Sequence, residues 1–192
     1  MNHSDDSLEI KSRFNPYRVD PDDRVLVVLD VRNITCCQSN NYTNTRIDYT
    51  KLLADVIKGR KCIGAIAVDG LKTDFRGRDE DRVFHKELEN SGFRVELVES
   101  SNNKGKQEGV DVAIALIAQE YAFRNQVDVV ELITGDGDFG VLVKRIQSYG
   151  VLVDVVSFFK NLSNSLKNKA DSVSLLDDLA AIRMLPKSQE AA

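Results

Sequence analysis

The sequence is poor in the residues that build zinc sites and disulfide frameworks. It contains two histidines, His3 and His85, and three cysteines, Cys36, Cys37 and Cys62, with no C-x-x-C spacing. An odd number of cysteines without that spacing indicates reduced thiols. The sequence therefore predicts neither a disulfide framework nor a zinc site.

Long hydrophobic segments and a net positive charge are also absent. The longest apolar runs, such as VLVVL at 25–29, are of strand length and far below the ~20 residues that a membrane span needs. The first 18 residues lack the apolar centre of a secretory signal, so we expect a cytoplasmic protein with no membrane partner. The net charge of −4 gives no overall attraction to nucleic acid, although local basic clusters can still supply it.

What remains is the composition of an ordinary globular domain. Of the 192 residues, 42% are hydrophobic and 29% are charged, which favours one domain with a sizeable core. We expect a polar N-terminal tail at 1–23, a domain at 24–180 and a C-terminal tail at 181–192.

From Arg24 onward, apolar runs of strand length alternate with segments of helical apolar spacing. The strands are predicted at 25–30, 62–69, 93–99, 127–134 and 151–158. The helices are predicted near 48–58, 79–91, 109–124, 138–149 and 161–168. The stretch 171–180 fits either an edge strand or a helical turn. This alternation is typical of βαβ units and predicts an α/β fold with a mainly parallel central sheet.

Polar side chains follow the predicted strands where those strands end. Asp30 closes the first strand, Thr134, Asp136 and Asp138 follow the fourth, and Asp111 lies in the first turn of a helix. Because the carboxyl ends of parallel strands meet at one edge, we expect these groups to lie close together. Clustered carboxylates need a counter-charge, and oxygen ligands without histidine or thiolate favour Mg²⁺ or Mn²⁺. Such an ion activates water and stabilises a phosphoryl transition state, so the pattern predicts phosphodiester hydrolysis.

Each of these features has an alternative interpretation. The glycines of ITGDGDFG at 133–140 also match the G-x-G-x-x-G spacing of a dinucleotide-binding turn, but acids stand between them and the turn follows the fourth strand. Asp138 can instead cap the following helix, and Asp111 can serve the first turn of its own helix through the helix dipole. Asp69 is better predicted as a turn residue, and His85 as structural or exposed.

Three motifs together resemble one known family. The runs VLVVLDVRNI, GVDVAIALIAQEYA and VDVVELITGDGDFGVLVKRIQSYGVLVDVVSF, with NSLKNKAD after them, resemble the NYN domain family of PIN-like ribonucleases, which includes the LabA-like bacterial proteins. The resemblance covers about 24–178 and rests on D-x-x-N, G-V-D-V and [ST]-G-D-x-D-F in this order. It implies a Rossmann-like, PIN-type three-layer sandwich, a metal-dependent nuclease site and an RNA substrate.

The resemblance also assigns roles to residues. It implies that the catalytic residues are Asp30, Asn33, Asp111, Thr134, Asp136 and Asp138. Among them Asp30, Asp111 and Asp136 are the implied ligands of Mg²⁺ or Mn²⁺, directly or through water. Family members often carry a second acid six residues after the helix acid, and here that position is Ile117. The site therefore holds one metal where relatives hold two, or the protein is a catalytically weak RNA-binding or regulatory module.

A third possibility is a phosphatase or phosphoacceptor domain of the doubly wound type. Such domains place the reactive aspartate after the first or third strand, with a lysine partner. The acidic turn after the fourth strand argues against this possibility.

Basic residues in the predicted loops at the same edge, together with aromatic residues, are candidates for RNA contacts. The predicted phosphate contacts are Arg32, Arg46, Lys104 and Lys106, with Lys72, Arg76 and Arg78 as further basic candidates. Tyr42, Tyr49 and Phe75 are candidates for stacking on unpaired bases, which favours single-stranded RNA. For any one of them, an ordinary solvated surface position is the alternative. Exposed sheet edges and the apolar residues of 171–185 make a homodimer a further expectation.

Overall fold

The core of the protein is a six-stranded sheet in which every pairing of neighbouring strands is parallel. The structure, a computed structural model, describes residues 19–71, 75–99 and 109–184. The strands lie in the order β4 (Arg94–Val98), β3 (Lys61–Gly70), β1 (Arg24–Asp30), β5 (Val129–Ile133), β6 (Leu152–Ser157) and β7 (Ser172–Leu175). The predicted α/β fold with a mainly parallel sheet is confirmed.

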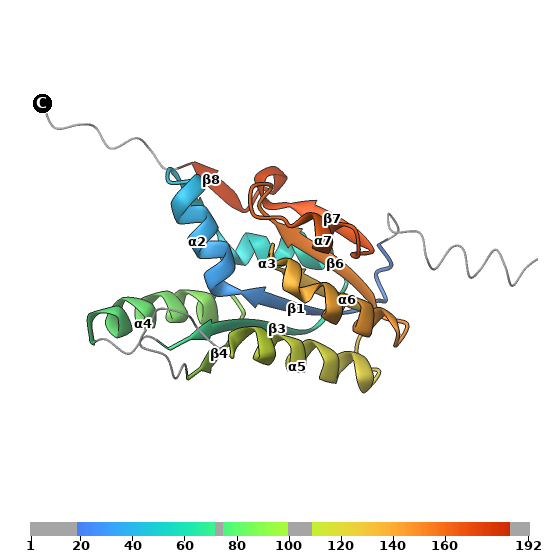
Figure 1. The fold of residues 1–192 in the computed structure, drawn as a ribbon. Coiled ribbons are helices and arrows are strands. Elements are labelled where there is room, and N and C mark those ends of the chain that lie inside the picture. The colour runs from blue at the N-terminus through green and yellow to red at the C-terminus, as the bar shows by residue number, and fades with distance from the viewer. Residues whose placement is uncertain (1–18, 72–74, 100–108, 185–192) are drawn as a thin grey trace, which may run out of the picture.

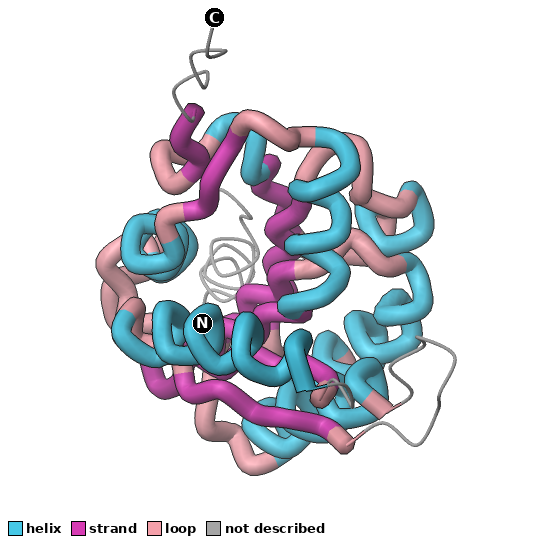
Figure 2. The backbone as a smooth tube through the Cα atoms, turned by 90° about the vertical axis from the view of Figure 1, so that its left-hand side faces the viewer, coloured by secondary structure: helices cyan, strands magenta, loops and turns pink. Residues whose placement is uncertain are grey.

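Helices cover both faces of this sheet, which gives three layers (Figures 1 and 2). The first face carries α2 (Val31–Asn41), α3 (Tyr49–Ile57) and α4 (Phe75–Asn90), and the second carries α5 (Val110–Phe123), α6 (Gly140–Gln147) and α7 (Asn164–Lys167). Alternate residues of β1 supply the two cores: Val25, Val27 and Leu29 pack toward α2 and α3, while Leu26 and Val28 pack toward α5 and α6. No helix in the described part of the chain has the length and hydropathy needed to cross a bilayer.

Helix α2 is an element that the apolar periodicity does not predict. Its sequence, VRNITCCQSNN, is mostly polar and β-branched, so its intrinsic helix propensity is low. Two features stabilise it. The Asp30 carboxylate caps its first turn by accepting a hydrogen bond from the Asn33 N–H at 3.1 Å, and its apolar residues Val31, Ile34 and Cys37 are buried on one face.

The C-terminal part of the described chain returns to the region after α2. Strand β8 (Ile182–Met184) pairs antiparallel with β2 (Thr45–Ile47), and Ala181 is fully buried. Residues 181–184, which the sequence analysis assigns to a tail, therefore belong to the folded unit. The stretch 171–180 contains both the edge strand and the helical turn that the sequence analysis gives as alternatives. Strand β7 is followed by a short 3₁₀ helix, η2 (Leu176–Asp178), with Leu176 in the core.

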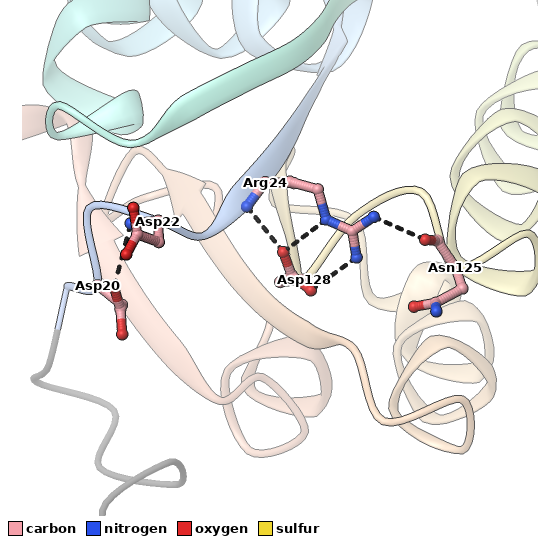
Figure 3. Close-up of polar contacts among 5 residues, drawn as sticks. All are labelled: Asp20, Asp22, Arg24, Asn125 and Asp128. Carbon is pink, nitrogen blue, oxygen red and sulfur yellow. Dashed lines mark hydrogen bonds and ion pairs between the residues drawn. The ribbon is translucent and has the colours of Figure 1, made fainter.

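An arginine joins the starts of the two central strands. The Arg24 guanidinium donates from Nε and Nη2 to the two carboxylate oxygens of Asp128, both at 2.9 Å, and from Nη1 to the Asn125 carbonyl at 2.8 Å (Figure 3). The Arg24 backbone N–H also donates to Asp128, at 2.8 Å. This bidentate pair fixes β1 against the residue that precedes β5.

A second ion pair is buried beneath α3. The Arg60 guanidinium donates to the Glu131 carboxylate and to the carbonyl of Val56, and it lies 3.9 Å from the Asp154 carboxylate. Both members are almost fully buried, with side-chain exposures of 3% for Arg60 and 1% for Glu131. Burial and the nearby Asp154 raise the pKa of Glu131 to about 7, although Arg60 acts in the opposite direction. The charge on Glu131 therefore depends on Arg60.

Candidate active site

The predicted site residues lie where the connections of the sheet change direction. From β1 the chain continues to β3 and β4 on one side, and it later returns to β5 on the other side of β1. The loops after β1 and β5 therefore diverge, and in open parallel sheets ligands bind at such a point. Asp30 is the last residue of β1, and Thr134 directly follows β5.

Asp30 is buried and held by neighbours from both strands. It is 4% exposed, and the Thr134 hydroxyl, which is itself fully buried, donates to its Oδ2 at 3.1 Å. The Asn33 N–H donates to the other oxygen at 3.1 Å. These bonds fix the orientation of the carboxylate at the junction of β1, α2 and β5.

Asn33 links the first strand to the loops after β5 and β6. Its side-chain oxygen accepts from the Gly135 N–H at 2.8 Å and from the Asn161 side-chain amide at 2.5 Å. Asn161, in the loop after β6, is a site neighbour that the sequence analysis missed. Its only sequence signal is a polar position just after a strand, which many loops share.

In the glycine-rich turn ITGDGDFG, three backbone amides are already bonded to side chains of the protein itself. The Gly135 N–H donates to Asn33, the Asp136 N–H donates to the Thr134 hydroxyl at 3.3 Å, and the Asp138 N–H donates to the Asp136 carboxylate at 2.9 Å. A side chain at Gly135 would collide with the Asn161 carbonyl, so this glycine is required by close packing. The dinucleotide-binding alternative does not fit these contacts.

Burial and neighbouring aspartates raise the pKa values of Asp30 and Asp111. Burial, followed by the charges of Asp111 and Asp136, raises the pKa of Asp30 from 3.8 to about 6, against the lowering effect of its hydrogen bonds. Asp111 lies exposed in the first turn of α5, and local desolvation with the charges of Asp136 and Asp138 raises its pKa. The four carboxylates therefore form one cluster of negative charge that a cation would stabilise.

The arrangement of strands and acids matches a known family. The model of the NYN domain matches residues 24–177, which is most of the chain. The chain belongs to the NYN domain family. NYN domains are generally classed as nucleases, so a nuclease-type hydrolase is the class of activity that the match supports.

Two other proteins are similar to this chain over different lengths. A crystal structure of a protein of unknown function from Vibrio parahaemolyticus superimposes with a TM-score of 0.70 at 30% identity, covering 84% of this chain and 97% of that one. The uncharacterized protein y4oD of Sinorhizobium fredii is 33% identical over 87 residues, which are 44% of this chain and 41% of that protein. The match thus spans less than half of the curated relative.

All six residues that the resemblance assigns to catalysis lie at this edge of the NYN domain. They are connected by the hydrogen bonds and charge interactions described above, and their catalytic roles remain predictions. Asp136, rather than Asp138, accepts the capping hydrogen bond of the short 3₁₀ helix η1 (Gly137–Phe139). Asp138 is exposed and makes no capping bond to α6.

The carboxylates are not packed as a ready-made metal cage. Within residues 19–71, 75–99 and 109–184, no three His, Cys, Asp or Glu side chains lie close enough together to hold a metal ion. Their oxygen donors nevertheless suit Mg²⁺ or Mn²⁺, because Mg²⁺ keeps several waters and commonly takes only one or two carboxylates. At most two of the aspartates would contact such an ion directly.

The predicted basic contacts do not converge on the cluster as a group. Arg32 is half-buried on α2 and borders a cleft between α2 and α4, and no ion pair among the described residues joins it to Asp30. Arg46 lies in β2 instead of a loop and pairs with Glu87 of α4 at 2.7 Å. The predicted contacts Lys104 and Lys106 lie outside the described residues, as does Lys72, while Arg76 and Arg78 fall within α4 instead of a loop.

The two described tyrosines proposed for base stacking are occupied within the fold. Tyr49 is 5% exposed and packs edge-on against Phe84 at 5.6 Å between ring centroids. Tyr42 stacks on Phe158 at 4.4 Å and donates from its hydroxyl to Asp177. Stacking on RNA by Tyr49 is therefore excluded by its burial.

A histidine–aspartate pair lies on the other face of the sheet from Asp30. The His85 Nε2 and an Asp69 carboxylate oxygen are 2.9 Å apart, and both side chains are buried. Asp30 is paired in register with Val68, whose side chain packs toward α5, so the next residue, Asp69, faces α4. Asp69 thus lies within β3, paired with Leu97 of β4, and not in a turn as the sequence analysis expects. Its carboxylate fixes α4 through His85.

Proposed function

We propose that this NYN domain is a ribonuclease that hydrolyses phosphodiester bonds of single-stranded RNA with the help of Mg²⁺ or Mn²⁺. The observation that carries the proposal is the buried Asp30, oriented by Thr134 and Asn33 and exposed to the charges of Asp111 and Asp136. A fold does not gain stability from placing repelling carboxylates together. Such clusters are typical of sites where a ligand or an ion supplies the missing positive charge.

The residues of the chain have distinct roles in this proposal. Asp30, Asp111 and Asp136 would hold the ion, at most two of them directly and the rest through water. The ion, when bound, would acidify a water and neutralise charge on the phosphoryl oxygens. Thr134 orients Asp30, and Asn33 is held in place by Gly135 and Asn161. Asn33 Nδ2 has no hydrogen bond to the described residues, and it can donate to a phosphate oxygen of the RNA.

A second candidate is an RNA-binding module with little or no turnover. The observation that favours it is Ile117, which stands where family members often carry an acid and packs against the core on the α5 face. With one acid fewer, the site can attract a cation and RNA while stabilising the transition state poorly.

The decisive measurement is cleavage of end-labelled single-stranded RNA with and without Mg²⁺ or Mn²⁺, by the wild type and by Asp136→Asn. We expect metal-dependent cleavage by the wild type and a loss of at least ~100-fold in the variant, the scale on which single electrostatic groups act in catalysis. Asparagine keeps an oxygen that can accept the Asp138 N–H, so the 3₁₀ helix η1 retains its cap.

Asp178→Asn is the matched control, because Asp178 is an exposed acid in η2. It removes the same charge and should cleave like the wild type. Equal cleavage by the wild type and Asp136→Asn would indicate a contaminating nuclease and contradict the proposal. RNA binding without cleavage in any metal would favour the second candidate.

Metal binding can be measured without RNA, as a thermal shift. A ligand that binds only the folded state at about 100 times its Kd stabilises that state by ~2.7 kcal/mol. We expect Mg²⁺ or Mn²⁺ to raise the Tm of the wild type and of Asp178→Asn, and to raise that of Asp136→Asn by less than half as much. Identical shifts in all three proteins would place the ion elsewhere.

A further inference from the structure

A cleft of about 510 Å³ lies between α2 and α4, next to the N-terminus of α2. Its walls include Val31 and Arg32, the two residues that directly follow Asp30, so it lies at the same end of the sheet as the candidate active site, on the side of α2 and α4. Figure 1 shows how α2 leaves the carboxyl end of β1 with α4 beside that end. Small-molecule sites typically have volumes of about 300–1,000 Å³, so the cleft has room for one nucleotide.

One face of α2 supplies most of the polar lining. Arg32, Thr35, Ser39 and Asn40 border the cleft, and their spacing of three, four and one places them on one side of the helix. None of these four side chains is buried. Hydroxyl and amide groups donate and accept hydrogen bonds, which suits the edge of a nucleobase.

The opposite wall carries an aromatic ring. Phe84 of α4 lines the cleft, and its ring is held by the edge-on contact with the buried Tyr49. A half-buried ring fixed in this way offers a surface for an unpaired base.

The charges of the lining argue against a site for several phosphates. Arg32 is the one cation that borders the cleft among the described residues, while Asp69 and Asp81 contribute two acids. A polyphosphate or a run of backbone phosphates would be repelled by this balance. A neutral base with a single phosphate near Arg32 matches it.

We propose that this cleft binds one unpaired base of the RNA, next to the phosphate that lies at the Asp30 cluster. The inference rests on the proposed ribonuclease function for the identity of the ligand, and it adds a base subsite on α2 and α4. The RNA backbone then passes around the N-terminus of α2, with Arg32 bound to the phosphate between the subsite and the cluster.

The cleft contains its own chemical reporter. Cys36 is exposed and lines the cleft, Cys62 is exposed at the start of β3, and Cys37 is buried. The wild-type protein is treated with iodoacetamide in EDTA, which prevents turnover, and alkylation of each cysteine is followed by mass spectrometry. We expect a saturating RNA tetranucleotide to slow alkylation of Cys36 by about fivefold or more, since thiol reactivity follows access, and to leave Cys62 unchanged.

Two further probes identify what is bound. Inorganic phosphate and a tetranucleotide without bases carry the charge of RNA but no ring, and neither should protect Cys36. Protection by the baseless tetranucleotide as strong as that by RNA would overturn the base subsite. Absence of protection by RNA would also overturn it, even if RNA is cleaved in the metal-dependent assay. Protection of Cys36 without cleavage would sustain the subsite while the nuclease proposal fails.

A fluorescence reporter gives an independent measurement. The sequence contains no tryptophan, so Ser39→Trp places a single indole at the rim of the cleft. We expect the tetranucleotide with bases to quench this fluorescence by stacking and the baseless one to leave it unchanged. The control Asn90→Trp stands at the exposed C-terminal end of α4, outside the cleft, and should respond to neither. Equal quenching in the two variants would mean non-specific binding and contradict the proposal.

Discussion

Replacing Asp30 by asparagine is expected to stabilise the metal-free protein at pH 8 while abolishing RNA cleavage. The pKa of Asp30 is raised from 3.8 to about 6 in the folded state, chiefly by burial and then by Asp111 and Asp136. Between these two pH values, the folded protein therefore keeps a proton on Asp30 that the unfolded chain has already lost. The difference corresponds to ~3 kcal/mol of stability that is present below pH 4 and is lost as the pH rises through 6.

Asparagine removes this penalty because it carries no charge. Its oxygen can accept the bond from the Asn33 N–H, and its amide group can donate to the Thr134 hydroxyl, which then acts as the acceptor. At about 2–4 °C per kcal/mol for a chain of this size, the Tm should rise by up to ~6–12 °C at pH 8 in EDTA. Melting curves of the wild type and variant from pH 4 to pH 8 test this directly. The curves should converge near pH 4.

Cleavage by Asp30→Asn should fall by ~100-fold or more. The Asp30 carboxylate is repelled by the neighbouring carboxylates in the metal-free protein, and we expect it to contribute to function by binding the metal ion. A variant that is less stable than the wild type at pH 8 would show that the carboxylate is a structural cap alone. A stabilised variant with full cleavage would remove Asp30 from the catalytic set.

Replacing Arg60 by methionine is expected to destabilise the protein by ~3–5 kcal/mol, the usual cost of removing one partner of a buried ion pair. Glu131 would remain almost fully buried without its ion-pair partner. Its other carboxylate oxygen has no hydrogen-bond partner among the described residues, so nothing there replaces the lost bond. The expected fall in Tm is about 10 °C or more at pH 8. The variant should recover part of its stability at lower pH, where Glu131 is protonated in the folded state.

The double variant Arg60→Met/Glu131→Leu separates the charge from the packing. It removes both members of the pair, so it should regain most of the stability that the single variant loses. Arg124→Met is the matched control, since Arg124 forms an exposed pair with Glu120 on α5, and it should change stability by less than ~1 kcal/mol. A loss in Arg60→Met no larger than in this control would show that the buried pair does not stabilise the fold.

The parallel sheet could be predicted because its strands are short apolar runs with clear ends. The strand predictions at 25–30 and 62–69 lie within one residue of β1 and β3 at each end. Helix α2 could not be predicted from periodicity, because a side-chain cap and tertiary packing stabilise it rather than propensity. The pairing of β2 with β8 joins three-residue segments that are far apart in sequence, and no local pattern encodes it.

The acidic cluster was predictable for a related reason. In a parallel sheet the carboxyl ends of the strands lie at the same edge, so Asp30 at the end of β1 and Asp136 in the turn after β5 are expected near each other once the strands are known. Asn161 and the cleft beside Arg32 depend on how loops and α2 pack, which the sequence alone does not determine. Arg46 was placed wrongly because the element after the first strand is a helix and not a loop.

The clamp between Arg24 and Asp128 joins residues that are 104 positions apart in the chain. At ~5–20 residues per second, a ribosome needs roughly 5–20 s to make the second partner after the first. Through that interval β1, whose residues 25–29 are all apolar, has no neighbour on its β5 side. An unpaired apolar strand is a template for joining other chains. The central position that buries β1 in the native protein thus leaves it without one of its neighbours in the nascent chain, and chaperone binding to newly made chains should map to Arg24–Asp30.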